Sequence, residues 1–441
     1  MRAYLNGNEA VAAAVKLARA EVVAAYPITP QSTIVEKVAE YIAGGSMAAD
    51  YIRVESEHAA LAACYGAAVT GTRVFTATSS QGLAYMFEML PYVSGCRVPL
   101  VMAVVNRGLA APWTIWADHQ DAIACRDTGW IQLYVETAQE ALDTCLQAYK
   151  ITCHPDVLTP VMVCLDGYVL SHTEEIVDVP VQEDADHFLP PYRPEYAVDT
   201  GRPYVFGVGA GPDLYPAFKY YQQQGLLQAK EVITAVDREF GTIFDRTYGG
   251  LVDPYFCDDA EVILVLMGAT AGTAREVVDD LRGQGERVGL LRLRSFRPFP
   301  VEDLQAHLAG VGVVAVLDRD CSFGYEGVLA TEVKAALYGP PAPLASGSGE
   351  GLERLPGQVR SSGVTGDCGG PEVPTDRPLR IGFTDNPASR PGQPLVAGFV
   401  GGLGGRDIDR GELTGIYRRC LEALRQQGRG GELVVSGSWQ K

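Results

Sequence analysis

The sequence has no Cys-x-x-Cys pair anywhere in its 441 residues, although it contains ten cysteines. Iron–sulfur clusters and zinc ribbons are held by closely spaced cysteines, so the spacing indicates neither kind of site in this chain. Most of the cysteines fall inside apolar stretches, where a free thiol behaves as a small hydrophobic side chain. We therefore expect core residues rather than ligands. The ten are Cys64, Cys96, Cys125, Cys145, Cys153, Cys164, Cys257, Cys321, Cys368 and Cys420.

Positive charge is also scarce. Lys and Arg number 36 against 54 Asp and Glu, which gives a formal net charge of −18. Such a surplus repels phosphate backbones and anionic lipid headgroups, so the composition argues against nucleic acid and membrane surfaces as partners. No apolar run reaches the about 18 residues that a membrane helix needs, and the N-terminus lacks a charged-then-apolar signal region. We expect a cytoplasmic protein.

Short apolar stretches alternate with helical patterns over the first 170 residues. This alternation predicts an α/β fold with a doubly wound, mostly parallel sheet. The predicted strands span residues 22–25, 51–54, 73–77, 99–105 and 159–165. The predicted helices span residues 8–18, 31–42, 57–70, 81–93 and 138–152.

A second α/β pattern begins near residue 259, so we predict a catalytic domain over residues 1–250 and a second domain over residues 256–441. Residues 183–202 are rich in Pro, Tyr and acidic residues, as an extended connector would be. A strand at 204–208 and a helix at 212–227 are then expected to close the first domain. Residues 340–394 are rich in Gly, Pro and Ser and predict a mobile insertion.

Three turns that follow predicted strands carry Thr29, Glu57 and Arg107. Ligands of an open parallel sheet bind outside the carboxyl ends of its strands, so these turns are expected to meet at one crevice. A hydroxyl, a carboxylate and a guanidinium at that place suggest a cationic or amphoteric cofactor beside an anionic substrate.

Each of these residues also has a structural explanation. Glu57 begins an alanine-rich helix, where an acid is stabilised by the helix dipole, although the alanines leave room for a flat ring. Arg107 follows a strongly apolar strand and suits either a structural ion pair or the bidentate binding of a planar carboxylate. Thr29 lies between two prolines, so it serves turn geometry or donates its hydroxyl to the same carboxylate.

Asp118, His119 and Asp121 fall in one loop and raise the question of a metal. The cluster does not match the ligand sets that metals prefer, and we favour a structural or interface role for it.

The sequence around these residues resembles the α subunit of pyruvate:ferredoxin oxidoreductases, within the 2-oxoacid:ferredoxin oxidoreductase superfamily. The resemblance covers nearly the whole chain except the insertion after Tyr338. It rests on residues 7–10, 25–33, 106–113, 118–121, 126–132, 164–167, 292–300 and 402–407.

The resemblance implies roles for four residues. Glu57 matches the acid that pairs with the aminopyrimidine ring of thiamine diphosphate, and Pro27 matches a residue beside that cofactor. Thr29 and Arg107 match the groups that hold the substrate carboxylate. The first domain would then bind the pyrimidine, and the second resembles the C-terminal domain of transketolases.

A complete thiamine diphosphate site also needs a Gly-Asp-Gly turn that holds magnesium and the diphosphate, and this chain has none. It also shows no iron–sulfur pattern to carry electrons. The sequence therefore predicts half an active site, completed in a hetero-oligomer. By resemblance, a β subunit would bring diphosphate, Mg²⁺ and an iron–sulfur cluster, beside a ferredoxin-like δ subunit and a γ subunit involved with coenzyme A.

The implied reaction is the reversible oxidative decarboxylation of pyruvate with coenzyme A, which yields acetyl-CoA and CO2 and passes electrons to ferredoxin. One alternative is the same chemistry on a branched-chain, aryl or oxalate substrate. Oxalate would call for an extra cation, whereas the neutral Thr29 favours a monocarboxylate. The other alternative is a structural subunit without chemistry, against which the presence of Thr29, Glu57 and Arg107 together argues.

Overall fold

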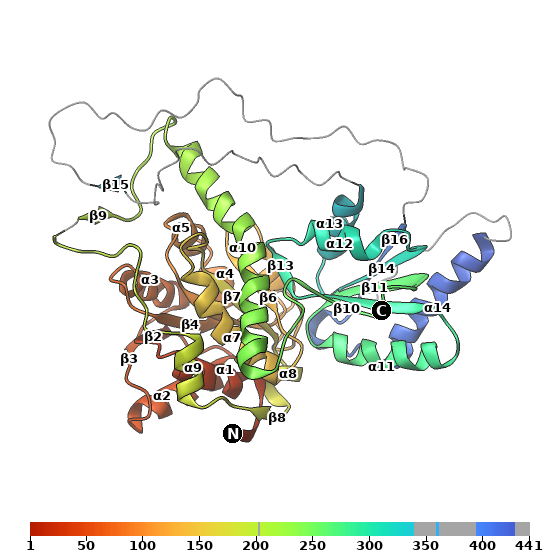
Figure 1. Ribbon diagram of the computed structural model, residues 1–441, viewed down its shortest axis with the longest axis horizontal. Helices are drawn as coiled ribbons and strands as arrows, with labels where there is room; N and C mark the ends of the chain where they lie inside the picture. The colour runs from red at the N-terminus through yellow and green to blue at the C-terminus, as the bar shows by residue number, and fades with distance from the viewer. Residues whose placement is uncertain (202, 339–358, 361–393, 428–441) are drawn as a thin grey trace.

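The computed structural model describes residues 1–201, 203–338, 359–360 and 394–427. Two mainly parallel sheets, each covered by helices on both faces, stand side by side in Figure 1. The doubly wound α/β fold expected from the alternating pattern is thereby confirmed. None of the helices in the described part of the chain is both long enough and apolar enough to cross a bilayer.

Seven strands form the first sheet, in the order β13-β6-β7-β5-β4-β2-β3. All run parallel except the edge strand β13, which comes from the later part of the chain and pairs antiparallel with β6. β5 and β7 are buried along their whole length, as expected for strands with helices on both faces. The strands are β2 (Val22–Ala25), β3 (Asp50–Arg53), β4 (Val74–Thr78), β5 (Val101–Asn106), β6 (Ile131–Tyr134), β7 (Val161–Asp166) and β13 (Ser295–Arg297).

The helices around this sheet are α1 (Gly7–Leu17), α2 (Ser32–Ala43), α3 (Glu57–Ala68), α4 (Ser80–Tyr85), α5 (Met89–Gly95), α6 (Gln120–Ala124), α7 (Ala138–Thr152), α8 (Val169–His172), α9 (Gln182–Phe188) and α10 (Tyr215–Phe244). Small side chains allow α1 to pack closely against α7, since four alanines of α1 are buried. Asn6 and Glu9 form a capping box that starts α1, and the Thr137 hydroxyl caps α7.

Five strands form the second sheet, in the order β10-β12-β11-β14-β16, with only β10 antiparallel. The strands are β10 (Val252–Tyr255), β11 (Val262–Met267), β12 (Val288–Leu293), β14 (Val313–Asp318) and β16 (Leu395–Val400). The helices are α11 (Thr270–Gly283), α12 (Val301–Leu308), α13 (Val328–Tyr338) and α14 (Arg410–Gln427), with a short 3-10 turn η1 (Leu403–Gly405). β10 lies between the two expected domains and β13 joins the first sheet, so the exact domain limits stay a prediction.

Three parts of the first unit differ from the sequence-based expectation. The helix expected over residues 81–93 is two helices, α4 and α5, with a break between them. The expected connector begins with the short helix α9, whose Phe188 packs edge-on against Phe240 at 5.1 Å between ring centroids. The helix expected to end at Leu227 continues as α10 to Phe244, because its buried residues keep helical spacing beyond that point.

Two small sheets lie outside the two main ones. β1 (Arg2–Leu5) pairs with β8 (Glu175–Asp178), and this pair was not expected from the sequence. The strand expected over residues 204–208 is present as β9 (Tyr204–Val205), which covers its first two residues and pairs with β15 (Val359–Arg360). The strand β6 was not expected either. β6 lies inside the first sheet but is only four residues long, so its apolar signal is weak. The predicted mobile insertion at 340–394 falls almost entirely outside the described residues.

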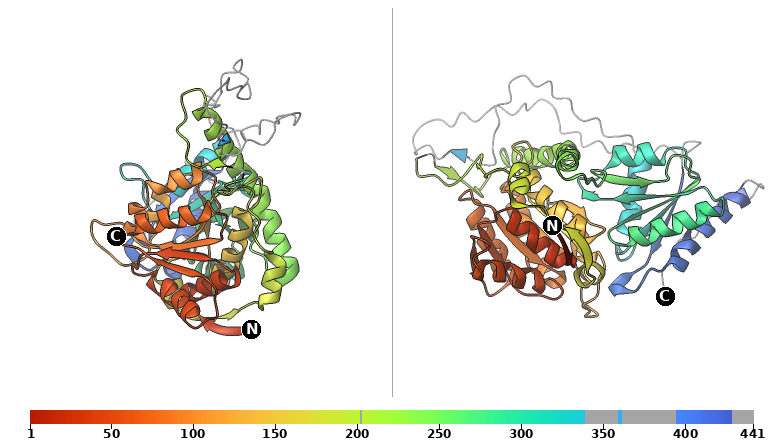
Figure 2. Two further views of the ribbon diagram at one scale, coloured as in Figure 1. Left: turned by 90° about the vertical axis from the view of Figure 1, so that its left-hand side faces the viewer. Right: turned by 60° about the horizontal axis from the view of Figure 1, so that its bottom comes forward.

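A buried group of charges connects α7 of the first unit with β12 of the second (Figure 2 gives two further views of the two units). Glu140 accepts hydrogen bonds from Arg292 Nη1 at 2.7 Å and from Arg294 Nε at 3.2 Å. Arg294 also donates to the Gly250 carbonyl and to Gln147, so its charge is well solvated by the protein. All three charged side chains are buried.

We expect Glu140→Gln to destabilise the chain by about 3 kcal/mol, because it removes the carboxylate that two buried guanidinium groups share, although Arg292 keeps its ion pairs with Glu136 and Asp253. The measurement is the free energy of unfolding from urea titration. Glu40→Gln is the matched control, since it breaks the exposed Lys37–Glu40 pair and should change stability by less than about 0.5 kcal/mol. Equal effects of the two changes would show that the buried group does not connect the units energetically.

Candidate active site

The turns that follow β2, β3, β4 and β5 meet at the carboxyl ends of the strands of the first sheet. These four strands are neighbours in the sheet, so their ends lie close together. Three of the turns carry the predicted residues Thr29, Glu57 and Arg107, and the fourth carries Ser80 and Gln81.

Arg107 lies at the centre of these turns and is only 3% exposed. Its Nη1 donates to the Thr29 carbonyl oxygen at 2.7 Å, and its Nη2 donates to Gln81 Oε1 at 2.7 Å. Its Nε is buried and has no hydrogen-bond partner in the described part of the chain. Burial lowers the pKa of Arg107, whereas the nearby charges of Asp121 and Glu57 raise it. The site therefore holds a positive charge with unused donors.

Thr29 contacts Arg107 through its backbone and not through its hydroxyl. The side chain itself is exposed, as is Pro27, so both face outward at this end of the strands. Two buried amides hold the turn from below: Gln31 Nε2 donates to the Tyr26 carbonyl at 2.8 Å, and Asn8 Nδ2 donates to the Pro30 carbonyl at 2.7 Å. Sequence reasoning assigned no role to these amides, although both lie in stretches that carry the family resemblance, residues 7–10 and 25–33.

Glu57 is the first residue of α3 and is 8% exposed. The Ser56 hydroxyl caps this helix by accepting from the Ala59 N–H at 3.2 Å. The carboxylate of Glu57 lies over Gly82 of α4, where an added Cβ would come within 2.8 Å of Oε1. We expected alanines of α3 to make room beside Glu57, and the structure adds this glycine from another helix.

Asp121 is buried beneath the candidate active site and forms hydrogen bonds to the turns that follow β4 and β5. Its Oδ2 accepts the backbone N–H of Ser80 at 2.9 Å and that of Arg107 at 3.0 Å. Its Oδ1 accepts from Asn106 Nδ2 at 2.8 Å and from the Ala122 N–H at 2.7 Å. Burial raises the pKa of Asp121 to about 6, although these donors lower it. The structural role that we favoured for this residue agrees with these contacts.

Asp118 and His119 contact the second unit. Asp118 Oδ2 accepts the Gly404 N–H at 3.1 Å, and the His119 N–H donates to the Arg319 carbonyl at 2.8 Å. His119 Nε2 lies 3.2 Å from Asp166 Oδ1, and Asp166 is also ion-paired with Arg319. Among the residues that the structure describes, no group of three or more His, Cys, Asp or Glu is arranged to hold a metal ion.

The thiols are also structural in the part of the chain that the structure describes. Nine cysteines are described, all are free, and eight of them are buried. This agrees with the expected role as small core side chains. Cys368 falls outside the described residues.

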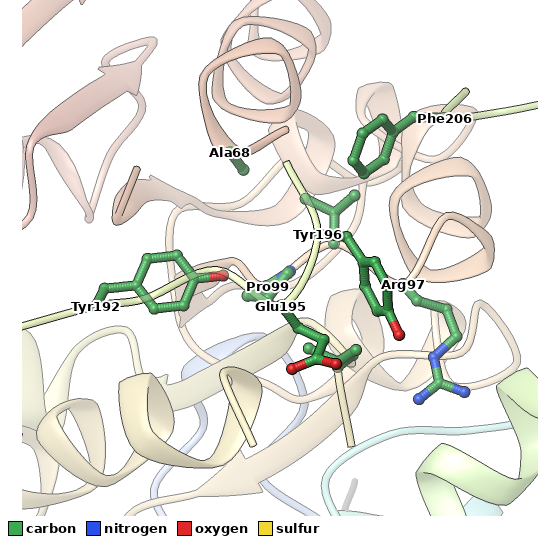
Figure 3. Close-up of a pocket in the computed structure, with 9 residues that line it drawn as sticks. Ala68, Arg97, Pro99, Tyr192, Glu195, Tyr196 and Phe206 are labelled. Atoms are coloured by element: carbon green, nitrogen blue, oxygen red, sulfur yellow. The ribbon is translucent and has the colours of Figure 1, made fainter. Parts of the chain in front are cut away.

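A small cavity lies at the other end of the strands of the first sheet, at the start of β5 (Figure 3). Its volume of about 10 Å³ has room for at most one water molecule. Arg97, Tyr192, Glu195, Tyr196 and Phe206 line it. Because Arg107 follows the end of β5, this cavity is separate from the candidate active site.

Two family models match the chain. The model described as pyruvate flavodoxin/ferredoxin oxidoreductase, thiamine diphosphate-binding, matches residues 13–238. The model of pyruvate:ferredoxin oxidoreductase core domain II matches residues 260–351.

Several curated proteins are similar over most of their length. Pyruvate synthase subunit PorA of Methanocaldococcus jannaschii is 52% identical over 76% of this chain and 86% of its own. The subunit of the same name from Methanothermobacter thermautotrophicus is 49% identical over 76% of this chain and 87% of its own. Ketoisovalerate oxidoreductase subunit VorA of Pyrococcus abyssi is 49% identical over 77% and 85%.

A solved structure shares the fold. It is 2-oxoglutarate:ferredoxin oxidoreductase from Magnetococcus marinus, with a TM-score of 0.61 and 22% identity, and the match covers 76% of this chain and 60% of that one. On the family model that spans the first sheet and on relatives at about half identity, this chain belongs to the pyruvate flavodoxin/ferredoxin oxidoreductase family.

Proposed function

We propose that this chain is the catalytic α subunit of a thiamine diphosphate-dependent pyruvate:ferredoxin oxidoreductase. The complex converts pyruvate and coenzyme A to acetyl-CoA and CO2 and passes two electrons to ferredoxin, and the reaction is reversible. The observation that carries the proposal is the meeting of Arg107, Thr29 and Glu57 at the carboxyl ends of the strands, with a buried cation that keeps unused donors.

The surroundings of Glu57 fit the aminopyrimidine half of thiamine diphosphate. Gly82 allows the carboxylate to lie close against α4, since a Cβ at this position would come within 2.8 Å of Glu57 Oε1. The hydroxyls of Thr78 and Ser79 are buried and have no hydrogen-bond partner within the described ranges. Buried polar groups are normally paired, so unpaired hydroxyls near a carboxylate suit a ring that carries both donors and acceptors. Pro27 is proposed to line the same site from the turn after β2.

Each residue then has a defined task. Glu57 holds a proton between its carboxylate and the pyrimidine N1′. Arg107 binds the carboxylate of the 2-oxo acid with its remaining N–H donors, and the exposed Thr29 hydroxyl donates to the same group. Bound thiamine diphosphate supplies the carbon nucleophile and the electron sink that decarboxylation of a 2-oxo acid needs.

The chain is proposed to act only within a multi-subunit complex. Its curated relatives are named as subunits, which supports this. Trp113 is 71% exposed although its ring lies 5.7 Å from the Arg107 guanidinium. Trp116, three residues further along the chain, is also exposed and packs edge to face against the exposed Tyr168. Exposed aromatic surface next to a site favours a protein partner.

We propose that a β subunit brings the diphosphate and Mg²⁺ sites and an iron–sulfur cluster. A γ subunit would be involved with coenzyme A, and a ferredoxin-like δ subunit would carry electrons onward. A cytoplasmic location belongs to the same proposal.

The test of this function is reconstitution. The chain alone should turn over no pyruvate, because the diphosphate half of the site is absent from its sequence. The assembled complex, supplied with pyruvate, coenzyme A and a viologen dye, should produce acetyl-CoA and reduced dye. Micromolar or tighter binding of thiamine diphosphate to the isolated chain, measured by calorimetry, would contradict the proposal that this chain holds only half of the cofactor site.

A second substrate follows from the relatives named ketoisovalerate oxidoreductase, which match this chain about as well as the pyruvate synthase subunits do. The branched-chain 2-oxo acid is therefore the alternative. The ratio of kcat/KM for pyruvate to kcat/KM for ketoisovalerate in the assembled complex decides between them, and a ratio below one would assign the branched-chain substrate.

We expect Glu57→Gln to lower kcat by about 10²-fold or more, because an amide cannot share the ring proton. Assembly and thermal stability should change little. Glu183→Gln, an exposed acid in the first turn of α9, is the matched control and should retain full activity. Near-normal turnover of the Glu57→Gln complex would show that Glu57 takes no part in the reaction.

We expect Gly82→Ala to weaken thiamine diphosphate binding by about tenfold or more. The added Cβ would lie 2.5 Å from Thr78 Oγ1 and 2.8 Å from Glu57 Oε1, so the carboxylate has to move. Gly66→Ala in α3 is the control, since a Cβ there meets nothing within 4 Å. Alanine favours helix over glycine by about 1 kcal/mol, so the control should be neutral or stabilising. Cofactor titration of both complexes tests the difference, and equal affinities would show that Gly82 borders no cofactor.

A further inference from the structure

Gln81 holds the guanidinium of Arg107 from the opposite side to Thr29. Its Oε1 accepts from Arg107 Nη2 at 2.7 Å, while Nη1 is held by the Thr29 carbonyl. Because a guanidinium only donates, the atom of Gln81 that faces it has to be the oxygen. Arg107 is therefore fixed through both of its terminal nitrogens.

Both acceptors of Arg107 are neutral. Within the described residues, no carboxylate lies close enough to Arg107 to form an ion pair, although the charges of Asp121 and Glu57 reach it. Its two hydrogen bonds go to a carbonyl and an amide, and its buried Nε keeps an unused N–H. Hydrogen bonds to uncharged acceptors orient the guanidinium without cancelling its charge, so the charge remains available for an anion.

The backbone beside Gln81 is itself tightly held. Ser80 has a φ of 48°, a left-handed conformation that is rare for a residue other than glycine. Its N–H donates to Asp121 at 2.9 Å and its hydroxyl lies 2.7 Å from the Gly108 carbonyl. Strained backbone of this kind persists where surrounding contacts determine it, and it clusters at functional sites. Gln81 directly follows this tightly held residue, and its side chain reaches Arg107.

We propose that Gln81 is a positioning residue that fixes the Arg107 guanidinium through a neutral acceptor and thereby preserves its full charge for the carboxylate of the 2-oxo acid. This inference rests on the proposed function. A purely structural glutamine would also have to supply an acceptor for Arg107, but that acceptor would not have to be uncharged.

Two substitutions in the assembled complex test the inference. Gln81→Met removes the acceptor, and the KM for pyruvate should rise by about 10-fold or more, as for a lost hydrogen bond to a charged group. Gln81→Glu keeps an acceptor but pairs with Arg107 and cancels its charge, so KM should rise at least as much while the melting temperature is kept or increased. In both variants kcat should change by less than about threefold.

A double-mutant cycle shows whether Gln81 acts through Arg107. In an Arg107→Met background, Gln81→Met should raise KM no further, because the group that it positions is already absent. Gln228→Met and Gln228→Glu on the exposed face of α10 are matched controls and should leave KM unchanged.

The outcomes separate the two proposals. A wild-type complex that converts no 2-oxo acid would overturn the proposed function and this inference with it. With an active wild-type complex, a normal KM in Gln81→Glu would assign a purely structural role to Gln81. Additive effects of the Gln81 and Arg107 changes would equally overturn the positioning role, while the proposed function would stand.

Discussion

The carboxylate of Asp121 joins the ends of two neighbouring strands beneath the candidate site. One oxygen accepts the backbone N–H groups of Ser80, after β4, and of Arg107, after β5. The other accepts the side chain of Asn106. Burying a carboxylate is costly, and burial raises its pKa to about 6, but four N–H donors offset that cost. The positions of both Arg107 and Gln81 depend on this one group.

Charge is handled in two different ways in this molecule. Between the two units, buried guanidinium groups are paired with carboxylates, as in Arg292 and Arg294 with Glu140 and in Arg319 with Asp166. At the candidate site, Arg107 is held by neutral oxygens instead. In the first arrangement each buried charge is compensated, so the loss of one partner would be costly. The second leaves a positive charge in a partly dry site, where its attraction for an anion is much stronger than in water.

Much of the fold could be predicted from the local pattern, because parallel strands covered on both faces are continuous apolar runs. The strands β5 and β7 were expected close to their observed limits for this reason. The break between α4 and α5 and the extension of α10 to Phe244 were not expected, since neighbouring elements and not local preference decide where those helices end.

The sequence alone determined which chemical groups stand at the ends of the strands: a carboxylate at Glu57, a guanidinium at Arg107 and a stiff turn at Thr29. It also determined that no Gly-Asp-Gly turn is present to hold a diphosphate. Only the tertiary structure decided how these groups are held, with Thr29 using its carbonyl, Gly82 making room for Glu57 and Gln81 orienting Arg107. The physical reason is that strand order brings together turns whose contacting residues lie 25 to 78 positions apart in sequence, and hydrogen bonds between such turns leave no local pattern.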